Sequence, residues 1–425
     1  MKVDLTDLSP VKKKLAIEAE TEEVEEETRA VLRAYRQKAR LPGFRAGKAP
    51  LEVIRSRFAK EVAEEVRDRL VWRLFQQAAQ EKGLKPLGEP SLEELEQEAG
   101  RSLSFKTTFE VLPEFELKSH KEVELRRPVA KVTDDDVDKA LEELRQSRAR
   151  LVVEEGRAAA EGDVVVADVE GTPEEGEPFK LERTQLEVGA QNNLPAFNEA
   201  LPGAEAGAEL EFPVEYPEDY GQKELAGKTV RFRLAVHEVK RRELPELDDE
   251  FAKDLGDFED LAALTARVRD DLDKRKKAEA EHETRQAVLQ EVMLHNPILL
   301  PEILVEHEIR RRLEEMVRGM MLQGMDPEKM EIDWAELRKR QEEPAKRAVH
   351  AQLILDAVAA TEKIEVEKQV VEDRIRSEAQ RLGEPVESLR SRLRKQGGME
   401  ALTNQLVREK SLDYLTSVAN IQYSE

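Results

Sequence analysis

The chain contains no cysteine among its 425 residues, and aromatic residues make up only 4% of it. The absence of cysteine excludes a disulfide framework, a thiolate nucleophile and any cysteine-ligated zinc site. The scarcity of aromatic side chains, together with 38% charged residues, favours long amphipathic helices over one compact globule. At about 100 to 200 residues per domain, the length predicts roughly three domains.

Long apolar runs are also missing. No run of about 18 apolar residues occurs, and the segment from Met1 to Asp7 lacks the pattern of a secretory signal. We therefore expect a cytoplasmic protein without membrane contact. The formal net charge of -23 excludes a protein that coats nucleic acid over its whole surface, because each phosphate contact needs a positive partner. An anionic partner must therefore meet a local basic patch.

Three segments resemble ligand-binding motifs, but each lacks a required feature. His282-Glu283 and His307-Glu308 begin like metalloprotease helices, but Gln286 and Arg311 stand where the second histidine is required. The segment 221–229 resembles a phosphate-binding loop, but it has one residue too many between its glycines. We expect no metal, no cofactor and no bound nucleotide.

Residues 1–112 are predicted to form an α+β domain with helices packed on an antiparallel sheet. Apolar and polar residues alternate over 103–111, which is the pattern of a half-buried strand. Upstream, we expect one helix capped by Thr21 and a second that begins at Pro50 and continues through Phe58 and beyond.

The remainder of the chain divides into three further segments. Residues 113–150 form an extended connector, with a short helix capped at Thr133, that we expect to pack with the C-terminal region. Residues 151–243 hold short strands between glycine and proline turns, which predicts a small β-rich domain. Residues 244–425 have helical periodicity with proline and glycine breaks, which predicts an elongated all-α domain whose helical hairpins project as arms.

A basic stretch stands out in this acidic chain. Seven cations and no acidic residue lie between Thr28 and Leu51: Arg29, Arg33, Arg36, Lys38, Arg40, Arg45 and Lys48. Glycines shape a tight turn around Phe44, and arginine can both grip phosphate and stack on bases. A solvated turn between two helices is the alternative interpretation, because charge runs often are only solvated faces.

The segment from Gly43 to Pro50 reads Gly-Phe-Arg-Ala-Gly-Lys-Ala-Pro and resembles the GFRxGKxP signature of the trigger factor family. The likeness extends over essentially the whole chain. It implies a chaperone that works without ATP, docks on the large ribosomal subunit beside the exit tunnel, and shields nascent polypeptides. The implied ribosome-binding residues are Gly43, Phe44, Arg45, Gly47 and Lys48. Many relatives carry a further cation where this chain has Ala46, so we expect weaker docking.

The β-rich segment resembles an FKBP-type peptidyl-prolyl isomerase domain, most clearly at Asn193 to Phe197. This likeness implies a secondary isomerase activity and a prolyl pocket formed by Phe179, Leu194, Phe197, Tyr220 and Phe232. Lys180, Val169 and Thr184 depart from residues common in that domain, so we expect a smaller, rougher pocket with low activity. The alternative is that these rings are only the core of a small barrel.

A methionine cluster on a predicted helix, broken by Gly319 and Gly324, offers candidate client contacts at Met316, Met320, Met321 and Met325. Ordinary hairpin core is the alternative interpretation. Two rival functions remain: a stand-alone prolyl isomerase or holdase acting off the ribosome, and a coiled-coil scaffold. The rRNA and protein of the large subunit and unfolded chains are the expected partners, and dimerisation of the free protein stays open.

Overall fold

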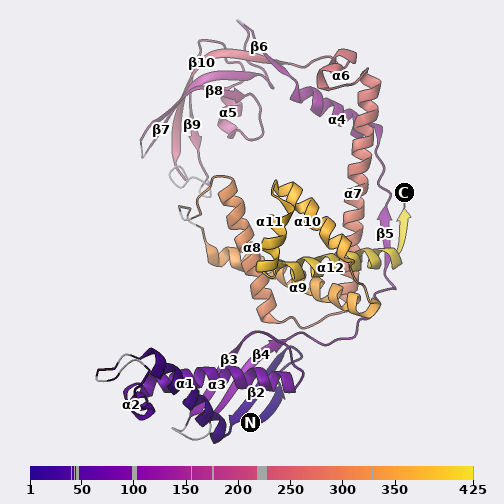
Figure 1. Ribbon diagram of the computed structural model, residues 1–425. Coiled ribbons are helices and arrows are strands. Elements are labelled where there is room, and N and C mark those ends of the chain that lie inside the picture. Colours follow the sequence, from indigo (N-terminus) through magenta and orange to yellow (C-terminus); the bar gives the residue numbers. More distant parts are fainter. Residues whose placement is uncertain are drawn as a thin grey trace. The chain divides into compact units, whose positions relative to one another are not determined.

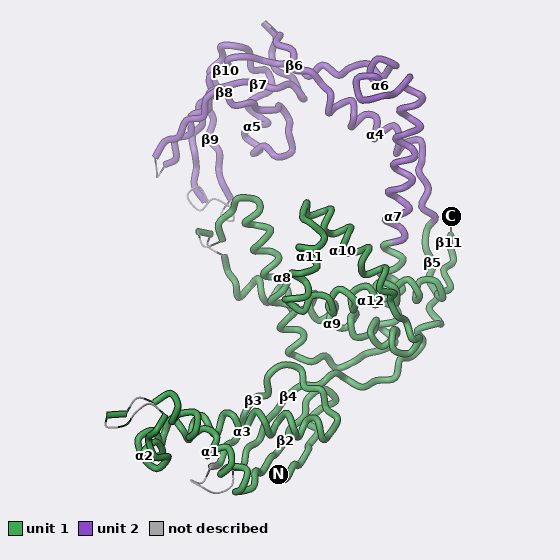
Figure 2. Tube along the Cα trace, viewed as in Figure 1, with its two compact units in different colours: residues 1–128, 282–425 green, residues 129–281 purple. Residues whose placement is uncertain are grey.

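The computed structural model describes residues 1–39, 41–42, 44, 47–97, 103–154, 156–174, 177–217, 227–327, 329–330 and 332–424. The chain forms two compact units, which Figure 2 colours separately. One unit comprises Met1–Pro128 and His282–Glu425, and the other comprises Val129–Glu281.

The first unit opens with a four-stranded antiparallel sheet in the order β1-β2-β4-β3. Its strands are β1 (Lys2–Asp7), β2 (Lys12–Ala19), β3 (Pro86–Gln97) and β4 (Leu103–Val111). Helices α1 (Thr21–Lys38), α2 (Leu51–Arg57) and α3 (Ala59–Glu81) follow β2 in the chain, and α1 and α3 pack on one another beside the sheet (Figure 1). Every second residue of β2 and β4 faces a core that Leu70, Leu74 and Phe75 of α3 complete.

Two details of the expected helices are wrong. The cap of α1 is Glu20 rather than Thr21, because Glu20 keeps an extended backbone and its N–H donates to the Glu23 carboxylate at 2.9 Å. The second helix is interrupted at Phe58, whose backbone lies at φ -118° and ψ 35° between α2 and α3. There the Phe58 ring packs on Tyr35 with 5.7 Å between centroids.

The second unit contains a five-stranded sheet in the order β6-β10-β7-β8, with β9 also paired to β10. Its strands are β6 (Arg150–Val153), β7 (Val164–Pro173), β8 (Phe179–Glu187), β9 (Glu209–Glu215) and β10 (Thr229–Glu243). A short helix, α5 (Pro195–Ala200), lies between β8 and β9 in the chain. Strands β7 and β10 supply most of the residues of the buried core, and valine is the commonest of them, as expected for strands covered on one face.

Helix α4 (Asp134–Ser147) precedes this sheet in the chain, and helix α6 (Asp249–Leu255) follows it. Both pack with the start of a long helix, α7 (Leu261–His295). Thr133 caps α4, since its Oγ1 accepts from the N–H of Asp136 at 3.3 Å, as the sequence predicts. Lys276 of α7 pairs with the Asp136 carboxylate at 2.7 Å and fixes the two helices together.

The rest of the first unit is mainly helical. Its helices are α8 (Glu302–Leu322), α9 (Trp334–Glu362), α10 (Lys368–Leu382), α11 (Val386–Lys395) and α12 (Gly398–Val418). Helix α8 continues through Gly319 and ends before Gly324, so the predicted break at Gly319 is wrong. Beyond its chain neighbours and its own helix backbone, a Cβ built on Gly319 would meet no atom of the described residues within 4 Å, so this residue lies on an open face of α8. A glycine is tolerated at such a position within a helix.

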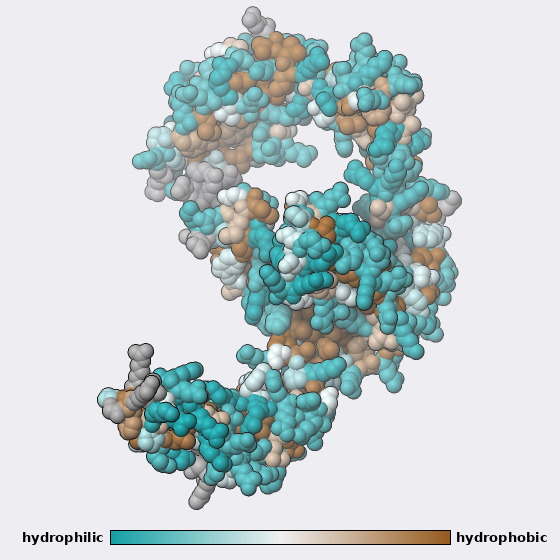
Figure 3. All heavy atoms as spheres, viewed as in Figure 1, coloured by the Kyte–Doolittle hydropathy of each residue, from teal (hydrophilic) through white to brown (hydrophobic). Residues whose placement is uncertain are grey.

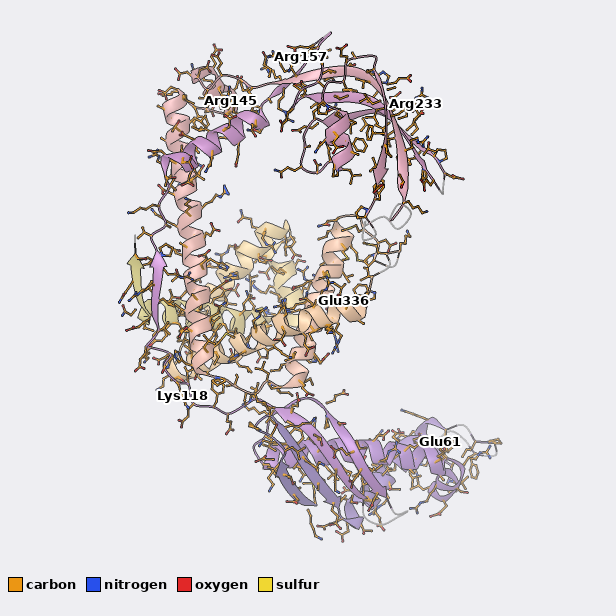
Figure 4. The ribbon with its side chains drawn as sticks, turned by 180° about the vertical axis from the view of Figure 1, so that it is seen from behind. Glu61, Lys118, Arg145, Arg157, Arg233 and Glu336 are labelled. Atoms are coloured by element: carbon orange, nitrogen blue, oxygen red, sulfur yellow. The ribbon has the colours of Figure 1, made fainter. Side chains whose placement is uncertain are left out.

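A parallel strand pair closes the chain. Strand β11 (Asn420–Ser424) pairs with β5 (Glu124–Pro128), and the helical periodicity gave no indication of it. In the connector, the backbone N–H of Lys118, a residue labelled in Figure 4, donates to the side-chain Oδ1 of Asn296 at 2.7 Å. The side-chain Nδ2 of Asn296 donates to the Lys118 carbonyl at 2.8 Å. The connector strand is therefore part of the helical region's core. The predicted multidomain α+β class, with an α+β first domain, a small β-rich domain and a helical C-terminal region, is confirmed.

Candidate functional site

The basic loop joins α1 to α2. Its described residues form a turn in which the Phe44 N–H donates to the Leu41 carbonyl at 3.2 Å. Gly47 has a φ of +77°, which favours glycine, and Lys48 is exposed. Phe44 is 42% exposed, so its apolar side chain is accessible to a partner. Gly43 and Arg45 lie outside the described residues.

Exposed cations continue from the loop along α1. Arg33 and Lys38 are exposed, and the exposed Arg29 donates from Nε to the Glu25 carbonyl at 3.3 Å and makes a long pair with the Glu25 carboxylate at 3.8 Å. Arg36 is half-buried, and its Nε has no hydrogen-bond partner. The second half of α1 therefore carries exposed positive charge that is available to a partner.

Helix α3 presents an acidic face that the sequence interpretation did not single out. A shallow hollow of about 630 Å³ is lined by Tyr35, Glu61, Glu64, Glu65, Asp68, Arg69 and Trp72. Figure 4 shows Glu61 among the helices of this domain. Partial burial and the Glu65 carboxylate raise the pKa of Tyr35. The signal was present in the sequence, because Glu61, Glu65 and Trp72 recur at the spacing of one helix face.

The β-rich domain brings four phenylalanine rings into one cluster. Phe197 of α5 lies edge-on to Phe232 of β10 with centroids 5.1 Å apart, and edge-on to Phe212 of β9 at 5.0 Å. Phe179 of β8 approaches Phe232 edge-on at 5.9 Å. The structure thus brings together three of the predicted pocket rings. Phe212 is an addition that the sequence interpretation missed, although its strand alternation placed it on the same sheet face.

Leu194 completes this surface from the start of α5. Its extended backbone, with ψ of 143°, precedes Pro195 at the first helical position, and its half-buried side chain packs against the same core. Tyr220 lies outside the described residues. Such an apolar aromatic surface suits a proline ring, since removing water from a prolyl amide eases rotation about it without any nucleophile.

The departures from common isomerase residues have distinct positions. Val169 is buried, with 3% of its surface exposed, and belongs to the domain core. Lys180 points to solvent and pairs with Glu170 at 3.2 Å, and this carboxylate raises the pKa of Lys180. The positive charge of Lys180 is therefore neutralised beside the aromatic cluster.

An apolar hollow runs along α8. Ile309, Leu313, Val317 and Met321 recur at four-residue steps, and Arg338 of α9 joins them around a volume of about 590 Å³. Glutamates and arginines of α8 form its rim. Figure 3 shows apolar side chains at the end of α8 within a mostly hydrophilic surface, where Met321 is 63% and Leu322 is 84% exposed.

The predicted methionines are distributed unevenly around this hollow. Met321 lines it, whereas Met316 and Met320 are half-buried and do not line it. Met325 follows the end of α8 and is 37% exposed. Helical spacing in the sequence could have found Ile309 to Met321, because those four residues share one face.

The described residues offer no cluster of histidine, aspartate and glutamate that could hold a metal ion. Glu308 is buried and accepts hydrogen bonds from Arg311 and Arg312 at 2.6 to 2.8 Å, which hold the pKa of its carboxyl below the usual value. Its charge is therefore engaged within α8. Among the described helices, none combines the length and apolar character that crossing a bilayer requires.

Comparisons with known proteins agree across the whole chain. The family profile described as "Bacterial trigger factor protein (TF)" matches residues 1–144, and its C-terminal counterpart matches residues 260–417. The profile "FKBP-type peptidyl-prolyl cis-trans isomerase" matches residues 155–237.

Similar proteins and structures carry the same description. The trigger factor of Solibacter usitatus is 35% identical over 405 residues, with 95% of this chain and 96% of the relative covered. That of Anaeromyxobacter sp. is 34% identical, covering 99% of this chain and all of the relative. A solved structure described as "Promiscuous Substrate Recognition in Folding and Assembly Activities of the Trigger Factor Chaperone" covers 98% of this chain and 99% of its own, with a TM-score of 0.51 at 22% identity. The chain belongs to the trigger factor family of ribosome-associated chaperones for nascent polypeptides, and it carries an FKBP-type peptidyl-prolyl isomerase domain.

Proposed function

We propose that the protein docks on the large ribosomal subunit, beside the exit of the nascent chain, through the loop Gly43 to Lys48. Phe44, Arg45 and Lys48 are the contact residues. The observation that carries this proposal is the Phe44 ring, 42% exposed between exposed cations. An exposed ring that becomes buried on binding supplies affinity, and flanking cations orient the loop on a phosphate-rich surface.

The charge pattern of the domain favours one orientation on rRNA. Arg33 and Lys38 of α1 extend the positive surface from the loop, whereas Glu61 and Glu64 make the exposed face of α3 negative. Phosphates attract the first surface and repel the second. We propose that α1 contacts the ribosome together with the loop, and that this takes place in the cytoplasm.

Cosedimentation with ribosomes tests the docking proposal. Phe44→Ala with Lys48→Ala is expected to weaken binding about thirtyfold or more, because an apolar anchor and one phosphate contact are lost. Trp334→Ala with Lys339→Ala is the matched control, since Trp334 of α9 is also 42% exposed and Lys339 is exposed. Equal binding by the loop variant and the wild type would overturn the proposal.

We also propose that the hollow on α8 takes up apolar segments of clients. Its apolar lining consists of Ile309, Leu313, Val317 and Met321, and charged residues of α8 together with Arg338 of α9 border this apolar stripe. Such a surface accepts many sequences, which suits a chaperone with broad client choice. Met316, Met320 and Met325 lie beside it on the same segment and extend the apolar contact.

A second copy of the chain is a further occupant of the hollow when clients are absent. Sedimentation velocity over a range of protein concentrations measures this self-association.

The prolyl site is proposed to consist of Phe179, Leu194, Phe197 and Phe232, together with Tyr220, whose hydroxyl would donate to the substrate carbonyl. The edge-on contacts of Phe197 and Phe232 support this assignment. The isomerase needs no cofactor or nucleotide, because twisting of the amide depends on binding alone. Acceleration of a proline-limited refolding reaction tests the site, and equal rates with the wild type and Phe197→Ala would contradict it.

A further inference from the structure

Three rings of the aromatic cluster and one glycine form a row of four positions across the sheet of the isomerase domain. Gly171 of β7 lies opposite Phe179 of β8 on one side and opposite Phe232 of β10 on the other, and Phe232 in turn lies opposite Phe212 of β9. Residues directly opposite one another point to the same face of a sheet. The row therefore reads phenylalanine, glycine, phenylalanine, phenylalanine, with one side chain missing.

The Phe179 ring fills the space that the missing side chain leaves. A Cβ built on Gly171 would lie 2.3 Å from Cζ, 2.6 Å from Cε1 and 2.8 Å from Cε2 of Phe179. The ring thus leans across the glycine toward Phe232, which it meets edge-on at 5.9 Å. Covering a strand glycine with an aromatic ring from the neighbouring strand is a known stabilising arrangement.

The need for glycine here is steric and does not come from the backbone. Gly171 is absent from the glycines with positive φ, so an alanine could adopt the same backbone conformation. The overlap with three ring atoms is too close to absorb without moving the Phe179 ring. An added methyl group at this position would therefore displace Phe179 and leave the strand pairing in place.

We infer that Gly171 is a positioning residue of the prolyl isomerase: by lacking a side chain, it lets the Phe179 ring lie against Phe232 as a wall of the proline-binding surface. This inference rests on the proposed role of Phe179 in that site. Gly171 itself contacts no substrate. Its effect on the reaction passes through the position of one ring.

A double-mutant cycle in the full-length protein tests the inference. The variants are Gly171→Ala, Phe179→Leu and the double variant, and the readout is kcat/KM for isomerisation of a proline-containing peptide. Each single change is expected to lower kcat/KM about tenfold, since a misplaced or missing wall loosens the substrate. The double variant is expected to lose about tenfold as well, and not about a hundredfold, because leucine leaves no ring to displace. Thermal unfolding of each variant is followed in parallel.

Each outcome decides one claim. Wild-type activity of Phe179→Leu would refute the proposed site and, with it, the inference. Impaired Phe179→Leu beside an unimpaired Gly171→Ala would refute the inference alone, and so would losses that multiply in the double variant. If Gly171→Ala unfolds the domain, recovery of folding in the double variant supports the inference, and a double variant that stays unfolded contradicts it.

Discussion

Making part of the apolar hollow on α8 polar is expected to weaken the binding of clients. The perturbation is Val317→Ser with Met321→Ser, which makes part of the hollow's wall polar. Neither residue belongs to the buried cluster formed by α8 and α9, whereas Leu313 packs against that cluster and is left unchanged. Serine and valine have similar helix propensities, so α8 is expected to persist.

The magnitude follows from the burial that a client can add. Full burial of a valine or methionine side chain is worth about 1.5 to 3 kcal/mol. Val317 is already half-buried, and one client segment covers only part of the exposed Met321. Half of one full burial for the pair is about 0.8 to 1.5 kcal/mol, which corresponds to a rise in Kd of about fourfold to tenfold.

The assay is fluorescence anisotropy of a labelled unfolded polypeptide titrated with each variant, with circular dichroism as a check on helix content. Leu294→Ser with Leu382→Ser is the matched control, since these leucines are 74% and 50% exposed and do not line the hollow. An unchanged Kd for the hollow variant would refute the reasoning. An equal loss in the control would show that general surface hydrophobicity binds clients, and would refute it too.

Three further predictions concern single contacts. Phe197→Ala should abolish acceleration of proline-limited refolding and leave ribosome cosedimentation unchanged, because the Phe197 ring packs on Phe212 and Phe232 within the isomerase domain. Thr133→Ala should lower the unfolding free energy by about 1 kcal/mol in urea titrations, since α4 loses its cap, and Thr133→Ser should restore it. Lys121, His120 and the Tyr414 hydroxyl lower the pKa of Glu362 from 4.5 to about 2. Because this pKa is lower in the folded state, the ionised Glu362 stabilises the fold at any pH above its unfolded pKa of 4.5, and this stabilisation is lost as the pH falls toward 2. The difference in unfolding free energy between wild type and Glu362→Gln should therefore be full at pH 7 and shrink as the pH falls from 4.5 toward 2. A difference that stays constant over this range would contradict the assignment.

Local signals in the sequence predicted the parts of the fold that depend on neighbouring residues. Alternation over β4 and capping at Thr133 are set within a few residues, and both are present in the structure. The interruption at Phe58 could not be predicted, because the ring's contact with Tyr35 overrides a periodicity that continues through it. Strand β11 was missed for a similar reason, since its partner β5 lies far away in the sequence.

The candidate sites show the same division. The exposed loop at Phe44 could be recognised from a contiguous motif, because its proposed contact residues are neighbours in the sequence. Phe212 and Gly171 acquire their roles only through cross-strand register, which brings distant segments into one row. The hollow on α8 requires Arg338 from a second helix, which no pattern within α8 indicates.

Photo-crosslinking on translating ribosomes tests the central claim most directly. A photoreactive side chain replaces Met321 in the hollow, either in the wild-type background or in one that carries Phe44→Ala and Lys48→Ala. Docking raises the local concentration of the hollow near the emerging chain, so the account predicts nascent-chain crosslinks that fall about tenfold or more when the loop is altered. Crosslinks of equal intensity in both backgrounds would contradict the claim that the loop brings the protein to the nascent chain.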